Sequence, residues 1–297
     1  MKYFIIFILI FIFGNFFVID LKSIILESSN IWLYNLVPSM LPFYVISDLL
    51  INYGLIDILA FLFKKIINKL FNVSENASFV IFFSMFTGFP SSAKYLKNLL
   101  DLNYISIEDA NKIIRFTHFS NPLFIINVIG NTIIGNKKIG FLILLSHYLS
   151  NFIIGFLYRK EQTQKITTKR IKNTKSFGSI LTASFINSFD SLLIVLGSLI
   201  TFKILTSIIF HYFGANFIIS SLLEITQGLF ALKYLTLNIE LKALIAVAMI
   251  SFGGFCIHTQ VYSILNETKI SYKNYFFSRI LHVIIATTIL TLFFILL

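Results

Sequence analysis

Apolar runs long enough to cross a membrane alternate with short polar stretches along most of this chain. A helix of about 20 apolar residues spans a hydrocarbon core about 30 Å thick. Each long run therefore predicts a membrane-crossing helix. After the first run, the predicted crossings lie near residues 31–51, 112–134, 138–158, 189–209, 243–264 and 278–297.

The first apolar run, from Tyr3 to Ile19, follows Lys2 and is not followed by a small-residue cleavage site. A cleaved signal peptide needs such a site. The run therefore predicts an uncleaved N-terminal transmembrane helix, assigned to residues 1–22, whose N-terminus faces the cytoplasm.

Polar residues interrupt the apolar stretch "SMFTGFPSSAKYLKNLL" at residues 84–100. The eight residues before Gly88 would rise only about 12 Å as a helix, less than half of the hydrocarbon core. Gly88 permits a turn, and Pro90 fits the first turn of a new helix. Ser91 and Ser92 are suited to cap that helix. The pattern predicts a re-entrant hairpin near residues 77–100, and a second broken segment predicts another near residues 217–238.

Composition places the chain among membrane proteins. Hydrophobic residues make up 57% of its 297 residues and charged residues 12%, and the mean hydropathy is +0.86. Globular domains usually contain about 25% charged residues, so this chain has too little charge to cover a soluble surface. The predicted fold class is all-α, a polytopic membrane protein.

The net charge of +11 is concentrated in the polar stretches between apolar runs. Residues 159–175, "RKEQTQKITTKRIKNTK", contain seven Lys or Arg residues. Cytoplasmic loops carry such an excess, so this linker is predicted to be cytoplasmic. The charge is assigned to topology, and no nucleic-acid partner is expected. The single cysteine, Cys256, excludes an intramolecular disulfide and is interpreted as an inert apolar residue.

Similar motifs recur in the same order on both sides of this linker. "FTGFPSSAKYL", ending at Leu96, corresponds to "ITQGLFALKYL", ending at Leu235, and "THFSNPLFIIN" corresponds to "ISFGGFCIHTQ". The first copy uses three crossings, an odd number, so the second copy is predicted to be inverted. The sequence thus predicts an inverted repeat of three spans plus one re-entrant hairpin each, after the N-terminal helix. The predicted units are a first repeat at 23–158, a basic linker at 159–176 and a second repeat at 177–297.

The hairpins and the interrupted spans are the candidate substrate site. A helix that ends inside a membrane leaves N–H and C=O groups that must be buried in protein or face a wet cavity. In transporters with inverted repeats, such broken helices hold the substrate. The predicted substrate-binding residues are Thr87, Gly88, Pro90, Ser91, Ser92, Asn121, Glu224, Thr226, Gly228, Gly253, Gly254 and Gln260.

Several polar residues have two interpretations. Glu224 lies in an apolar setting and is either a ligand of the solute or a structural hydrogen-bond acceptor. Asp190, near the start of a predicted span, is either interfacial or part of the site. His147 and His282 occupy matching places in the two repeats, and they either hydrogen-bond a neighbouring helix or relay protons.

The chain lacks the motifs of membrane proteases, namely HExxH, GxSxG and GxGD. Its five histidines are dispersed along the sequence, and His118 has a nearby serine without an orienting carboxylate. The chain is therefore predicted not to be an enzyme and to bind no metal or cofactor.

The motifs "PSMLPFYVISDLL", "TGFPSSAKYLKNLL", "RFTHFSNPLFI", "LEITQG" and "SFGGFCIHTQ" resemble the YlbJ family of sporulation integral membrane proteins, within the nucleoside-recognition or Gate group. The resemblance covers nearly the whole chain. It implies a role in spore development and an architecture similar to the Gate regions of nucleoside and ferrous-iron transporters. The nucleoside-contacting motifs of the concentrative transporters do not match.

Two functions are therefore expected as alternatives. The first is a permease for a small polar solute, nucleoside-like or anionic, with a central site between the two hairpins. The second is a non-transporting membrane assembly factor needed for the spore envelope or cortex. The expected location is the bacterial inner membrane or the forespore membrane. The expected partners are membrane lipid and a small solute, together with a second copy of the chain or other sporulation membrane proteins.

Overall fold

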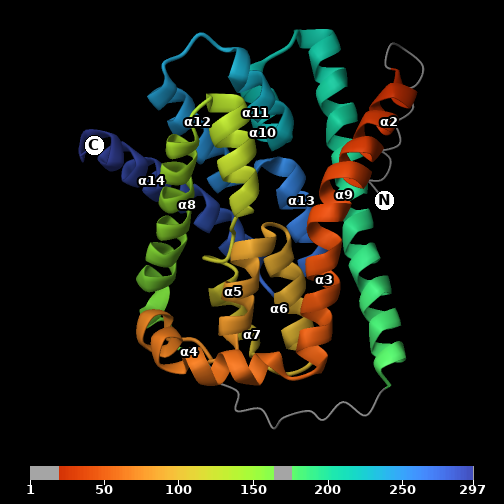
Figure 1. The fold of residues 1–297 in the computed structure, drawn as a ribbon, viewed down its shortest axis with the longest axis vertical. Helices are drawn as coiled ribbons and strands as arrows, with labels where there is room; N and C mark the ends of the chain where they lie inside the picture. The colour runs from red at the N-terminus through yellow and green to blue at the C-terminus, as the bar shows by residue number, and fades with distance from the viewer. Residues whose placement is uncertain (1–19, 164–175, 297) are drawn as a thin grey trace.

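The computed structural model describes residues 20–163 and 176–296, and every regular element within them is a helix (Figure 1). The all-α prediction is confirmed for these residues. The predicted transmembrane helix at 3–19 and most of the basic linker lie outside the described ranges.

Several helices are long and apolar enough to cross a membrane, as the hydrophobic pattern predicts. In the described part of the chain they are Lys137–Lys160, Phe177–Phe213, Ile239–Leu265 and Tyr272–Leu296, with the bent pair Met40–Asn52 and Leu55–Phe71 as a fifth candidate. In element labels, these ranges contain α8 (Lys137–Leu157), η3 (Tyr158–Lys160), α9 (Phe177–Phe213), α12 (Ile239–Phe252), α13 (Gly254–Leu265) and α14 (Tyr272–Leu296). The chain is a multi-pass membrane protein.

The first described crossing is longer than predicted. The helices α2 (Leu21–Ile31), η1 (Trp32–Leu36) and α3 (Val37–Asn52) follow one another without a gap. The side chain of Asp20 caps the start of α2 by accepting a 3.0 Å hydrogen bond from the Ser23 amide, so the helix begins well before residue 31.

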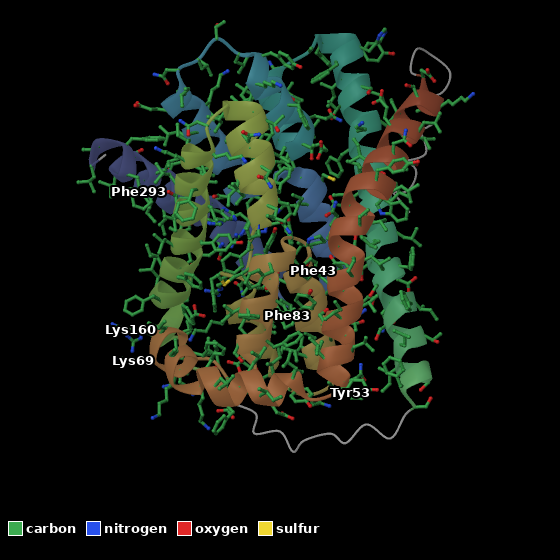
Figure 2. The ribbon with its side chains drawn as sticks, viewed as in Figure 1. Phe43, Tyr53, Lys69, Phe83, Lys160 and Phe293 are labelled. Atoms are coloured by element: carbon green, nitrogen blue, oxygen red, sulfur yellow. The ribbon has the colours of Figure 1, made fainter. Side chains whose placement is uncertain are left out.

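The next helix turns sharply away from α3 and lies on the surface of the molecule. Gly54 adopts a positive φ of 86°, and α4 (Leu55–Phe71) then runs at 86° to the preceding helix, across the lower end of the molecule (Figure 1). Lys64, Lys65 and Lys69 are exposed on α4 while its other face is buried. Figure 2 shows Lys69 and Lys160 at the same lower end.

The last residue of α4 is packed tightly against two other elements. The Phe71 ring stacks on Phe116 with ring centroids 4.8 Å apart, and it stacks on Phe152 of α8 at 6.2 Å. Gly155 of α8 leaves room for this ring, because a Cβ there would lie 2.7 Å from Phe71 Cδ1. The surface helix is therefore fixed to α8 and to the segment that contains Phe116.

Two pairs of short helices occupy opposite ends of the molecule. The pair α5 (Ala77–Thr87) and α6 (Ser91–Asp101) lies in the lower half, and the pair α10 (Phe217–Leu223) and α11 (Ile225–Tyr234) lies in the upper half (Figure 1). The longest of these helices has 11 residues, which corresponds to about 16 Å. None of the four helices is long enough to cross a membrane alone.

Pro90, rather than a serine, occupies the N-cap position of α6, and no side chain caps that helix. The prediction that Ser91 and Ser92 cap it is wrong. Both serines already lie within α6, whereas a capping residue has non-helical dihedral angles that let its side chain reach back to the first amides.

The two predicted interruptions are present. The first lies between α7 (Ile107–Ile113) and the π-helix η2 (Phe124–Ile134), where residues 117–121 have no regular structure. The second lies between α12 and α13, where Gly253 adopts a φ of 93°. Both regions were predicted from the glycine and proline in their sequences.

Helix α9 begins at Phe177 rather than near residue 189 and has 37 residues. The Ser176 hydroxyl caps it by accepting a hydrogen bond from the Ser179 amide. Asp190, expected near the start of a span, instead lies well inside this helix with its side chain exposed.

Helices η2 and α8 approach each other backbone to backbone. A Cβ on Gly130 would lie 2.7 Å from the Cα of Gly140, a distance that real Cβ contacts do not reach. Only glycine allows this approach.

We expect Gly130→Ala to destabilise the protein by about 1–3 kcal/mol, because one helix must move to admit the methyl group. Gly197→Ala is the matched control, since Gly197 lies in α9 with nothing within 4 Å of its Cβ position. Thermal unfolding of the purified variants in detergent micelles measures the difference. Equal melting temperatures for the two variants would contradict the close approach.

Candidate functional site

The two interruptions meet at the middle of the molecule. A Cβ on Gly253 would lie 2.9 Å from Nε2 and from Cε1 of His118, so the interruption before α13 lies against the one before η2. The Phe89 ring, at the tip of the α5–α6 pair, stacks on the His118 ring with centroids 4.8 Å apart. One helix-pair tip and both interruptions are therefore in contact.

Each helix pair also touches the interruption that follows it along the chain. A Cβ on Gly88 would lie 2.8 Å from the amide nitrogen of Asn121. Correspondingly, a Cβ on Gly254 would lie 3.4 Å from the amide nitrogen of Ile225, the first residue of α11. In each half of the chain, therefore, the tip of a helix pair packs against an interruption.

Side chains from α8 and α14 satisfy the backbone groups that the first interruption exposes. The Ser120 amide donates to Nε2 of His147 at 3.0 Å. The Asn151 amide group donates to the His118 carbonyl at 2.8 Å, and the Arg279 guanidinium donates to the Arg115 carbonyl. Buried backbone groups need such partners, so these side chains make the interruption possible.

Asn121 continues this pattern at the start of η2. Its Oδ1 accepts hydrogen bonds from the amides of Leu123 and Phe124 at 2.8 and 3.3 Å, and its Nδ2 donates to the Phe86 carbonyl at 2.8 Å. The side chain therefore caps the helical residues 122–123 that lead into η2 and ties them to the end of α5.

Four of the five histidines lie together in this region, although they are dispersed along the sequence. They form a chain of ring contacts, from the pair His147 and His282 at 4.6 Å between centroids to the contact of His258 with Tyr275 at 5.1 Å. His118 links the two groups through Tyr275, whose hydroxyl lies 2.9 Å from its Nδ1. Sequence spacing carried no signal for this cluster.

Hydrogen bonds fix the ring protons of two of these histidines. Because His147 Nε2 accepts from the Ser120 amide, its proton lies on Nδ1, which is 3.1 Å from Ser251 Oγ. His282 Nε2 donates to the His147 carbonyl at 2.9 Å, and its Nδ1 accepts from Arg279 at 2.9 Å. Both nitrogens of each ring are occupied, which supports the structural interpretation over a proton relay.

The histidine cluster does not have the geometry of a metal centre. Among the residues that the structure describes, no three His, Cys, Asp or Glu side chains are grouped so as to hold a metal ion. Backbone and side-chain groups of the protein are the hydrogen-bond partners of these rings.

Glu224 lies between α10 and α11 and is only 3% exposed. Its two carboxylate oxygens accept hydrogen bonds from the amides of Thr226 and Gln227, at 3.0 and 2.8 Å. A carboxylate in this place also interacts favourably with the positive end of α11. In this conformation Glu224 is thus a structural acceptor that caps α11.

The remaining predicted residues lie in different environments, and several have structural partners within their own helices. Pro90 and Ser92 are buried at the start of α6. Thr87 and Gln260 hydrogen-bond within their own helices, to the Phe83 carbonyl and to Cys256 Sγ respectively. Gly228 is a packing residue, since a Cβ there would lie 2.5 Å from the Cα of Ser221. The residues brought together at the interruptions are Gly88, Asn121, Glu224, Thr226, Gly253 and Gly254.

Two buried charges are not among the predicted site residues. Asp48 of α3 and Lys94 of α6 form an ion pair with 3.6 Å between Oδ2 and Nζ, and both side chains are 5% exposed. The signal was present in the sequence, because an ionisable residue inside an apolar segment indicates function by default. Asp48 lies in a predicted span and Lys94 in a predicted hairpin.

The fold and the apolar helices define a polytopic membrane protein. Residues 33–137, which extend from η1 to the start of α8, match the family model named Gate, described as "Nucleoside recognition". The chain is also 27% identical over 305 aligned positions to the sporulation integral membrane protein YlbJ of Bacillus subtilis (strain 168), and the match covers 89% of this chain and 75% of that protein. The chain is a homologue of YlbJ, as its motifs indicated. No solved structure matches it.

We expect His147→Ala to lower the melting temperature, because the substitution leaves the buried Ser120 amide without its acceptor. A lost partner of this kind costs about 1–3 kcal/mol. His211→Ala is the control, since His211 is exposed in the last turn of α9. The two variants are compared by thermal unfolding, and a similar melting temperature for both would rule out the capping role of His147.

Proposed function

We propose that this protein is a transporter-like permease for a small polar solute and that it acts in sporulation. The carrying observation is the contact between His118 and Gly253, at which the two interrupted spans and the tip of one helix pair meet. Broken helices that face one another at mid-membrane form the solute sites of transporters. The homology to YlbJ supports the role in sporulation.

The proposed permease has two inverted halves. In support, the α5–α6 pair and the α10–α11 pair lie at opposite ends of the molecule (Figure 1). Helix α4 runs across the lower end (Figure 1), and its Lys69 lies there together with Lys160, which belongs to the basic linker (Figure 2). By the positive-inside rule this end is cytoplasmic, so α5–α6 enters from the cytoplasm and α10–α11 from the other side.

The proposed solute is polar and is bound near the starts of α6 and α11. The N-terminal amides of a helix and its positive end favour acceptor or anionic groups. Helix α6 begins at Ser91 without a side-chain cap, and its Ser91 and Ala93 amides donate to the carbonyls of Gly88 and Pro90 at 3.1 and 3.0 Å. The positive end of α6 is therefore the feature proposed to attract the solute. The proposal includes no catalysis and no cofactor.

A second function is a non-transporting assembly factor of the spore envelope, with sporulation membrane proteins or a second copy as its partners. Its support is that protein groups already occupy both oxygens of Glu224 and both ring nitrogens of His147. A region that binds no ligand can pair all of its polar groups with one another in this way. Either function places the protein in the inner membrane or the forespore membrane.

The inverted arrangement predicts which positions can be labelled from each side. In a Cys256→Ser background, single cysteines at Lys65, Thr168 and Tyr272 should react from the cytoplasm, and those at Ser29, Asn136 and Ala215 from outside. Thr168 lies outside the described residues and tests the linker. Membrane-impermeant thiol reagents on intact cells and on inverted vesicles measure the reaction. Labelling of Lys65 and Ala215 from one side would exclude the inverted arrangement.

Variants of Glu224 separate capping from a role of its charge. Glu224→Asn removes the charge and keeps a good helix cap, whereas Glu224→Asp keeps both. The variants are expressed in Bacillus subtilis lacking YlbJ. If the carboxylate binds solute or transfers protons, we expect cells with Glu224→Asn to form at least tenfold fewer heat-resistant spores than cells with the wild-type chain. The amount of the variant protein in the membrane should be normal.

Glu224→Asp should remain near wild type in the same strain. A Ser91→Ala/Ser92→Ala variant tests the opposite tip and should also fail. If the strain with Glu224→Asn and the strain with the serine variant both sporulate fully, the central site is excluded and the assembly factor is favoured.

A further inference from the structure

The ion pair between Asp48 and Lys94 is built unlike a tight structural salt bridge. Its two charged atoms are 3.6 Å apart, whereas a hydrogen bond between an ammonium and a carboxylate is about 2.7–2.9 Å long. Within the described part of the chain, Oδ2 of Asp48 is buried and has no hydrogen-bond partner. A buried charge is normally hydrogen-bonded at every polar atom, so Oδ2 of Asp48 lacks a hydrogen-bond donor.

The surroundings hold both side chains in place. Oδ1 of Asp48 accepts a 3.1 Å hydrogen bond from Asn98 Nδ2, and Asn187 of α9 also interacts with this carboxylate. Lys94 Nζ donates to Ser188 Oγ at 3.3 Å and lies 4.4 Å from the centre of the Tyr44 ring. These contacts hold both side chains in place while Oδ2 of Asp48 stays without a hydrogen-bond donor.

The missing group must both donate and accept a hydrogen bond. Asp48 Oδ2 can only accept, and the Lys94 ammonium can only donate. One oxygen atom can lie about 2.8 Å from both groups at once, because twice this hydrogen-bond length exceeds their separation. A hydroxyl group satisfies both requirements, since it donates to the carboxylate while its lone pair accepts from the ammonium.

The cluster is continuous with the tip of the α5–α6 pair. Ser91, at the start of α6, donates to the Tyr44 hydroxyl at 3.3 Å, and the Tyr44 ring contacts Lys94. The cluster also joins the two halves of the chain, because Asp48 and Lys94 belong to the first half and Ser188 to the second. A solute held here would contact α3, α6 and α9 together.

We propose that Asp48 and Lys94 bind a hydroxyl group of a neutral, polyol-like solute, such as the sugar of a nucleoside or a free sugar. The site deepens the proposed permease function and rests on it. Lys94 recognises the lone pair of the hydroxyl and Asp48 its proton, while Tyr44 and Ser91 adjoin the same site. A solute without hydroxyl groups is not recognised.

The test is ligand-induced thermal stabilisation of the purified full chain, with ribose, uridine and uracil as probes. Ribose and uridine should raise the melting temperature, and uracil, which has no sugar hydroxyls, should not. Asp48→Leu/Lys94→Met removes both charges together, so no unpaired charge stays buried, and it should abolish the stabilisation. If that variant does not fold, Asp48→Asn/Lys94→Gln keeps the polar groups and should weaken binding roughly tenfold, because hydrogen bonds to charged groups are about twice as strong as neutral ones.

The matched control is the exposed ion pair of Lys97, on the same helix, with Glu267. Lys97→Gln/Glu267→Gln should bind ribose and uridine as the wild type does. Equal stabilisation by uracil, retained ribose binding in Asp48→Leu/Lys94→Met, or no stabilisation by either sugar-containing probe would overturn the proposal. In the last case the pair holds a water only.

A parallel titration of Glu224→Asn separates the two proposals. If ribose binding is lost in Glu224→Asn and persists in Asp48→Leu/Lys94→Met, the solute binds at the helix-pair tips. The permease proposal then stands and the hydroxyl site is wrong. If binding is lost only in Asp48→Leu/Lys94→Met, the hydroxyl site is supported.

Discussion

The whole arrangement depends on satisfying backbone polar groups inside an apolar interior. The segment between α7 and the Asn121 carbonyl is not part of a continuous helix, and an unpaired peptide group in a membrane costs several kcal/mol. His147, Asn151 and Arg279 provide the missing partners from two neighbouring helices. These three polar side chains are buried because the interruption needs them, and their positions in turn fix how α8 and α14 pack.

Local chemistry predicted the interruptions, since glycine and proline act on the residues next to them. Gly88, Gly253 and the Asn121–Pro122 dipeptide break helices wherever the chain places them. The histidine cluster was not predictable in this way. His118 and His282 are far apart in the sequence, and only tertiary packing brings them to the same centre.

The start of α9 was missed because its first turns are rich in serine, which lowers the apolar signal. Inside a helix, serine can donate to the carbonyl four residues earlier, as Ser188 does to Ser184 at 2.6 Å. The Asp48–Lys94 pair was missed for another reason. Each residue was considered only within its own element, and the pattern of one element does not show which charge another element brings to it.

The stacking of Phe71 on Phe116 connects helix α4 to the centre of the protein. Phe71 ends the surface helix α4, and Phe116 lies two residues before His118. Because the two rings are packed face to face against Gly155, α4 cannot tilt without displacing the segment that contains His118. A movement of α4 relative to α8 is therefore passed through this pair of rings to the segment before His118.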